Sequence, residues 1–176
     1  MMKRMLTMSI WILTLLITAV LSIAFFGSSN FFARAINIPL VLGFSFIIFR
    51  YPYRGYVVLA VLFYIVDLHS ALPFGMMLSA GLLAGWGIVF VQQNILKNFA
   101  LYSVVLYTLI GTALYYLLLM VMILCAQQLH ILQSGTVDWH TFIVTAATQM
   151  VVHSVLLVTV FLFVKFFHHR LLHHSS

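Results

Sequence analysis

The sequence predicts an all-α integral membrane protein, a bundle of six transmembrane helices with both termini in the cytoplasm. The chain has 176 residues, of which 65% are hydrophobic and only 6% are charged, whereas about a quarter of an average soluble domain is charged. Its apolar residues form six segments separated by short polar breaks. All lysines and arginines except Arg34 lie in breaks that six spans place on one side of the membrane.

This composition excludes a soluble globular protein, a disordered chain and a nucleic-acid-binding module. A water-facing surface with so few charges would aggregate, so most side chains must face lipid or one another. The net charge of +6 is therefore interpreted as a signal of topology and of contact with anionic lipid. Cys125 is the single cysteine, which excludes an internal disulfide and a thiolate metal cluster.

The six segments are bounded by polar breaks and together form one membrane domain. The predicted spans cover residues 5–26, 36–49, 56–72, 75–91, 99–126 and 141–167. Pro39 falls in the first turn of the second span, where a missing N–H costs least. The second, third and fourth segments are shorter than the ~20 residues that a bilayer requires. We expect them to extend into their flanks, to lie in thinned bilayer or to be shielded by neighbouring helices.

The positive-inside rule sets the orientation of the predicted bundle. One side carries the basic residues Lys3, Arg4, Arg50, Arg54, Lys97, Lys165 and Arg170. That side is therefore the cytoplasm, and it holds both termini. The beginning of the chain resembles a secretory signal, but its apolar core of about 20 residues is longer than that of a cleaved signal, roughly 7–15 residues. We expect a retained first helix.

Two membrane-embedded polar residues are the first candidates for a functional role. Asp67 lies in the outward half of the third span, and a buried acid in lipid is costly enough to be a functional candidate. It could instead cap a short helix at the turn of residues 73–75, or pair with Arg34 or His69 near the outer surface. His153 lies in the middle of the sixth span, deeper than Asp67. We expect it to be neutral and hydrogen-bonded within the bundle, beside Gln149.

The fourth span carries small residues at the spacing of membrane helix contacts. Gly75 with Ser79, and Gly81 with Gly85, are separated by three residues. Such spacing lets two helix backbones approach closely in lipid, where dispersion drives association. This face is predicted to pack either inside the bundle or against a partner chain.

Catalytic readings are disfavoured, because the chain has only two acids, Asp67 and Asp138, and acid–base chemistry usually needs a pair. Asp67, His69 and Ser70 are triad residue types, but neighbours in sequence do not have triad geometry. Ser79 with His153 would be an intramembrane serine dyad, but Ala80 stands where such proteases have glycine.

The C-terminal tail offers the one pair of residues with metal-ligand spacing. His169 and His173 are four residues apart, a spacing that can bind a metal on a helix. Contact with the lipid surface is the simpler interpretation. The sequence therefore predicts a protein that is not an enzyme and has no cofactor and no metal.

The order of these features resembles the MreD family, the small membrane component of the bacterial rod shape-determining system. The resemblance covers residues 38–116 and rests on four motifs. They are a proline opening the second span in residues 37–39, a short basic turn at 51–54, the aspartate-to-glycine stretch DLHSALPFG from Asp67 to Gly75, and a basic turn at 96–101. The chain departs from the family in residues 63–66, which lack the usual glycine before the aspartate.

The resemblance implies a fold similar to the substrate-binding subunits of energy-coupling-factor transporters. It also implies a multi-pass, non-enzymatic scaffold of the bacterial inner membrane. Such a scaffold would contact the MreC-type periplasmic protein and link MreB filaments to the cell-wall synthases and peptidoglycan synthesis.

The alternative is a vitamin-binding subunit of an energy-coupling-factor-type transporter. That function needs an outward pocket with several polar groups. The candidates for those groups are Arg34, Asn37, Asp67, His69, Gln127, Gln128, His130, Asp138 and His140.

Overall fold

The structure is a computed structural model that describes residues 17–18, 20–21, 36–49, 51–95, 100–133 and 137–173, with side chains as far as Phe166. Every regular element within these ranges is an α-helix. The main elements are α3 (Ile38–Ile48), α4 (Pro52–Leu68), α5 (Met76–Asn94), α6 (Leu101–Gln128) and α7 (Trp139–His173).

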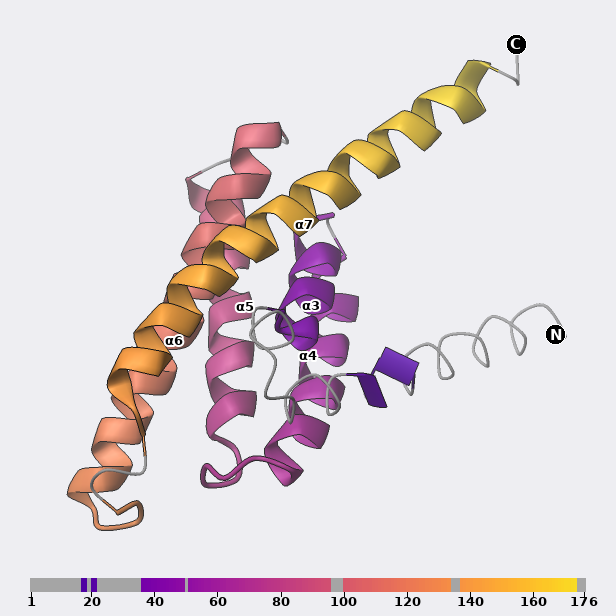
Figure 1. Ribbon diagram of the computed structural model, residues 1–176. Helices are drawn as coiled ribbons and strands as arrows, with labels where there is room; N and C mark the ends of the chain where they lie inside the picture. The colour runs from indigo at the N-terminus through magenta and orange to yellow at the C-terminus, as the bar shows by residue number, and fades with distance from the viewer. Residues whose placement is uncertain are drawn as a thin grey trace, which may run out of the picture.

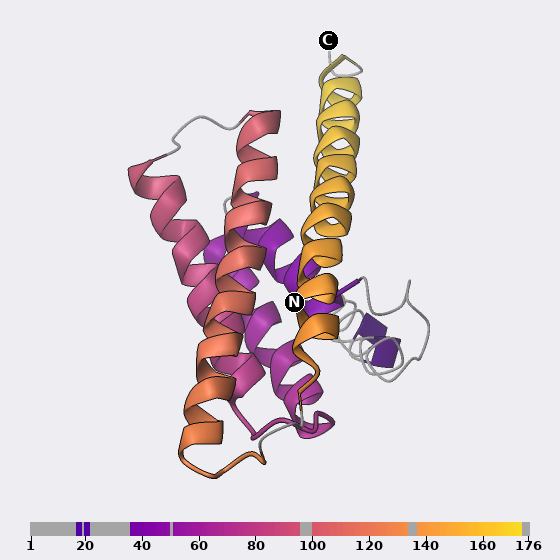
Figure 2. The ribbon, with the colours of Figure 1, turned by 60° about the vertical axis from the view of Figure 1, so that its left-hand side comes forward.

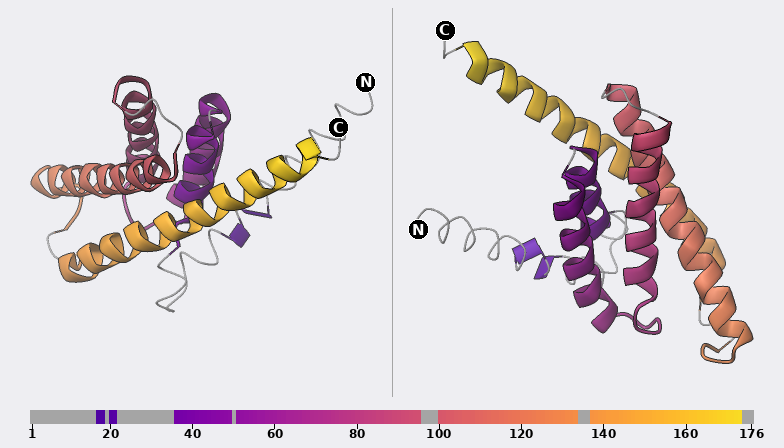
Figure 3. Two further views of the ribbon diagram at one scale, coloured as in Figure 1. Left: turned by 90° about the horizontal axis from the view of Figure 1, so that it is seen from above. Right: turned by 180° about the vertical axis from the view of Figure 1, so that it is seen from behind.

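Consecutive helices lie side by side and run in opposite directions (Figures 1 and 2). The turn from α4 to α5 and the connection from α6 to α7 therefore share one end of the bundle, which we call the outer end. Helix α7 crosses the bundle obliquely, and its C-terminal half projects beyond the other helices (Figure 3).

Three of the described helices are long and apolar enough to cross a membrane, rather than the six expected. They are Met76–Asn94, Leu101–Gln128 and Trp139–Phe166. Helix α3 has 11 residues and spans roughly 16 Å at 1.5 Å per residue, about half of a hydrocarbon core. Helix α4 has 17 residues. The first predicted span, residues 5–26, lies largely outside the described residues.

The helix boundaries differ from the predicted ones for local reasons. Pro52 occupies the first turn of α4, so residues 52–54, expected as a turn, begin a helix four residues earlier than predicted. Arg54 lies over the Tyr51 ring, 5.1 Å from its centroid, which holds this basic side chain at the helix start. Helix α3 begins only at Ile38 because the Asn37 side chain accepts the Leu40 N–H and caps it.

Glycines bring the helix backbones together in the core. A Cβ added to Gly81 would lie 2.4 Å from Phe63 of α4, and one added to Gly85 would lie 2.9 Å from Leu59. Between α3 and α4, a Cβ on Gly55 would lie 2.8 Å from the backbone oxygen of Gly43. The small-residue face of α5 is thus covered by α4 of the same chain.

We predict that Gly55→Ala destabilises the bundle by about 1–3 kcal/mol, because overpacking against a backbone atom cannot be relieved by a rotamer change. Gly87→Ala is the matched control, since its new methyl meets only the Leu114 side chain. Both substitutions gain helix propensity of about 1 kcal/mol. Unfolding by dodecyl sulfate in mixed micelles measures both variants, and equal stabilities would contradict this account of the α3–α4 contact.

Candidate functional site

The Asp67 carboxylate joins two helices at the outer end. Asp67 is 3% exposed, and its oxygens accept backbone N–H groups from the beginning of α5. Oδ2 accepts from Gly75 at 3.1 Å and from Leu78 at 3.0 Å, and Oδ1 accepts from Met77 at 3.2 Å. These are among the N–H groups that a helix cannot satisfy itself. Asp67 on α4 is therefore the N-terminal cap of α5.

The turn between Asp67 and α5 depends on glycine. Gly75 is the residue before α5 and has φ of 94°, in the left-handed region that glycine adopts most easily. In this conformation the Gly75 N–H donates to the Asp67 side chain. The Ser79 hydroxyl donates to the Gly75 carbonyl at 2.6 Å. Residues 67–79 thus form one hydrogen-bonded unit.

A second polar cluster lies deeper, where α3 begins. His153 is fully buried, and its Nε2 accepts the Asn37 backbone N–H at 3.0 Å. Its Nδ1 lies 3.5 Å from Thr112 Oγ1. Because Nε2 is an acceptor, the proton of the neutral ring is assigned to Nδ1. The half-length helix α3 is therefore anchored at its N-terminus by α7, across 116 positions of sequence.

Five aromatic rings connect α4, α6 and α7 beside these clusters. The Phe63 and Tyr115 rings stack at 5.4 Å, Tyr115 meets Tyr116 edge to face at 5.2 Å, and Tyr116 meets Phe142 at 5.3 Å. Phe142 in turn meets Trp139 at 5.7 Å. The Tyr115 side chain also hydrogen-bonds Asn37, and that of Tyr116 hydrogen-bonds Gln149.

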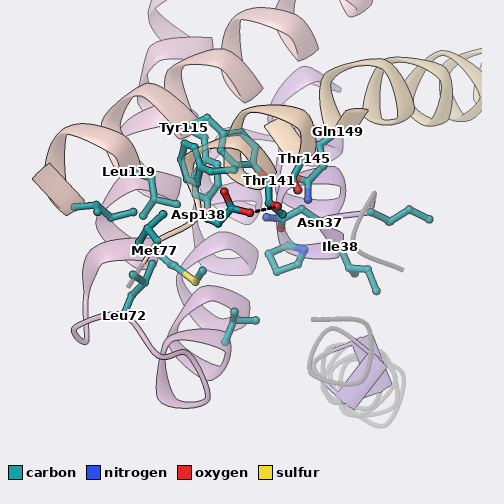
Figure 4. Close-up of a pocket in the computed structure, with 17 residues that line it drawn as sticks. Asn37, Ile38, Leu72, Met77, Tyr115, Leu119, Asp138, Thr141, Thr145 and Gln149 are labelled. Carbon is teal, nitrogen blue, oxygen red and sulfur yellow. Dashed lines mark hydrogen bonds between the residues drawn. The ribbon is translucent and has the colours of Figure 1, made fainter. Parts of the chain in front are cut away.

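A cavity of about 410 Å³ opens between the beginning of α3 and the outer end (Figure 4). This volume is within the range of small-molecule sites, roughly 300–1,000 Å³. Most of its wall is apolar. Its polar lining consists of Asn37, Tyr115, Tyr116, Asp138, Thr141, Thr145 and Gln149. Among the described lining residues, Asp138 and Thr141 are the two that are exposed, so they mark the mouth of the cavity.

Asp138 at the mouth caps α7 as Asp67 caps α5. Its carboxylate accepts the Thr141 hydroxyl and, at 3.1 Å, the His140 backbone N–H. The Thr141 hydroxyl, then the backbone N–H groups, hold the pKa of Asp138 below its ordinary value. Both acids of this chain are thus engaged at helix N-termini, where negative charge is favourable.

The catalytic constellations considered from the sequence do not assemble. Ser70 donates to the carbonyls of Asp67 and Leu72, and the exposed His69 bonds the Ile65 carbonyl. Ser79 bonds the Gly75 turn and not His153. Asp67 and His153 belong to separate clusters. The side chains of His169 and His173 lie outside the described residues.

Of the polar residues proposed for an outward pocket, the structure brings Asn37 and Asp138 to the cavity. Asp67 faces α5 instead, while His69 and His130 are exposed elsewhere. Sequence reasoning missed Thr141, Thr145 and the two tyrosines. For the two threonines the signal was spacing, since residues 138, 141, 145 and 149 recur every three to four positions along one helix face.

We predict that Asp67→Asn lowers the free energy of unfolding by about 2–3 kcal/mol, because an amide presents one acceptor oxygen to three buried donors. Asp138→Asn is the control, since asparagine caps an exposed helix end about as well as aspartate. Thermal unfolding in mild detergent compares the two. A midpoint for Asp67→Asn as high as that of Asp138→Asn would refute the capping role.

Comparisons of the chain with protein-family models, with curated proteins and with solved structures find no match. Two features of the described residues are the candidates for a functional role. One is the capped turn from Asp67 to Gly75, and the other is the cavity whose mouth is at Asp138.

Proposed function

We propose that this protein is an MreD-like, non-enzymatic scaffold of the bacterial inner membrane. In this proposal the chain crosses the bilayer six times, with both termini in the cytoplasm. It presents a shaped intramembrane surface to an MreC-type single-span protein and so connects MreB filaments with the cell-wall synthases. Helices α3 and α4 complete the span count in a locally thinned or protein-shielded part of the bilayer.

The observation that carries the proposal is the joint use of Asp67 and Gly75. These two residues define the main motif of the resemblance, and they meet in one hydrogen bond of 3.1 Å. This hydrogen bond explains why an aspartate is followed eight residues later by a glycine. The aspartate caps the next helix, and the glycine supplies the left-handed turn that presents the N–H. The motif therefore stabilises the fold, and a purely structural role for it is compatible with a scaffold protein.

A partner helix must use a surface other than the glycine face of α5, because α4 covers Gly81 and Gly85. The described helices expose large apolar side chains that are available to lipid or to a partner. Examples are Trp86 on α5, Leu117 on α6 and Val151 on α7, each 60–64% exposed. One of these faces is proposed to receive the transmembrane helix of the MreC-type protein.

Depletion in the rod-shaped host tests the proposal. We predict rounded cells that regain their shape with the wild-type gene, and co-purification of an MreC-type protein from mild detergent. A photo-crosslinking residue at 86, 117 or 151 should capture that partner from one helix face and not from the others. Normal rods after depletion, together with purified protein that lacks the partner, would overturn the scaffold proposal.

The cavity favours a second candidate, the vitamin-binding subunit of an energy-coupling-factor-type transporter. Its volume and its mixture of apolar walls with polar groups resemble small-molecule sites. Co-purification of a water-soluble vitamin and of a transporter ATPase module would support this candidate. Recovery of the MreC-type protein without either of them would favour the scaffold.

A further inference from the structure

The cavity extends from the beginning of a short helix towards the outer end of the bundle. Helix α3 has 11 residues and begins beside His153 in the interior of the bundle. The neighbouring helices continue to the outer end, where α4 turns into α5 and Asp138 precedes α7. Among the described residues, the cavity is bounded by Asn37 at the beginning of α3 and by Asp138 at its mouth.

We propose that this cavity binds a single-chain amphiphile with an uncharged, hydroxyl-bearing head, such as a monoacylglycerol. The alkyl chain lies along the apolar wall, and the head lies at Asp138 and Thr141. This inference goes beyond the scaffold function and does not depend on it.

The wall of the cavity suits an alkyl chain. Aliphatic side chains supply most of it, from α3, from the Asp67 turn and from α6, with Pro39, Met77 and Ile123 as examples. Deep in the cavity, the Tyr115 side chain bonds Asn37 and that of Tyr116 bonds Gln149, while the buried Oε1 of Gln149 accepts no hydrogen bond from the described residues. The alkyl chain is therefore placed along the aliphatic side of the wall, because an apolar group against that oxygen would keep it unsatisfied.

The wall suits an aromatic vitamin less well. Stacking on a protein ring is one favourable contact for a flat ligand. Each described ring that lines the cavity has part of its surface covered by another ring of the protein. Tyr115 stacks on Phe63, while Tyr116 and Phe142 meet edge to face. Aliphatic contacts thus dominate what a ligand would meet.

The residues at the mouth of the cavity determine which ligand head group is favoured. Asp138 is the one charged residue among the described residues that line the cavity. Its carboxylate accepts bonds from Thr141 and His140 and retains lone pairs for another donor, because two carboxylate oxygens offer about four acceptor sites. A hydroxyl head can donate to it. An anionic head would place like charges together, which is unfavourable.

Bromine quenching of tryptophan fluorescence in nanodiscs tests the proposal. The full chain with Trp11→Phe and Trp86→Phe keeps Trp139, whose ring contacts Phe142 of the cavity wall at 5.7 Å. The probes are dibromostearoyl glycerol and, at alkaline pH, dibromostearate. Thr145→Phe fills the cavity, and Thr148→Phe is the matched control, because Thr148 lies on the same helix outside the cavity lining.

We expect saturable quenching by dibromostearoyl glycerol that Thr145→Phe abolishes and Thr148→Phe retains. Dibromostearate should bind about tenfold more weakly, as a like-charge contact requires. Asp138→Asn, which keeps the helix cap, should reduce this preference to about twofold.

Quenching that rises linearly with probe, or that survives Thr145→Phe, would overturn the proposal. Equal binding of the anion to the wild-type chain would also overturn it. Displacement of the glycerol probe by riboflavin, thiamine or biotin would assign the cavity to a soluble vitamin instead. Because partner recovery is measured separately, failure here is distinguishable from failure of the scaffold function.

Discussion

The structure depends on how α5 begins at the outer end of the bundle. The first N–H groups of α5 have no partner in their own helix, and a buried N–H left unsatisfied costs about 1–3 kcal/mol. Asp67 supplies acceptors for three of them from the preceding helix. One side chain therefore fixes where α4 ends, how the chain turns at Gly75 and where α5 starts.

The rest of the packing follows from that turn. Once α5 is set against α4, Gly81 lies against Phe63 and Gly85 against Leu59, so closely that an added Cβ would force these side chains to shift. Phe63 is then placed to begin the row of aromatic rings that reaches α7. The cluster of Asn37 and His153 anchors α3 to the same framework. The cavity lies between the beginning of α3 and Asp138.

The sequence was sufficient to predict the features of the fold that depend on local chemistry. Apolar runs predicted the long helices, proline at position 39 indicated the beginning of α3, and capping by Asp67 was among the roles considered. The short segment predicted at 36–49 agrees with α3 to within two residues. Its contact could not be predicted, because hydropathy does not reveal that this helix starts against a histidine 116 residues away. Thr141 and Thr145 were missed because isolated threonines in an apolar helix resemble packing residues. Pro52 was predicted to lie in a turn, but it occupies the first turn of α4. Proline is also common at that position of a helix.

Amide hydrogen exchange of the wild-type protein tests the central claim most directly. N–H groups in the first turn of an uncapped helix exchange almost as freely as those of a loop. If Asp67 holds them, the Gly75, Met77 and Leu78 amides will exchange as slowly as those in the middle of α5. Rapid exchange at these three amides, alongside protected amides later in the helix, would contradict the account.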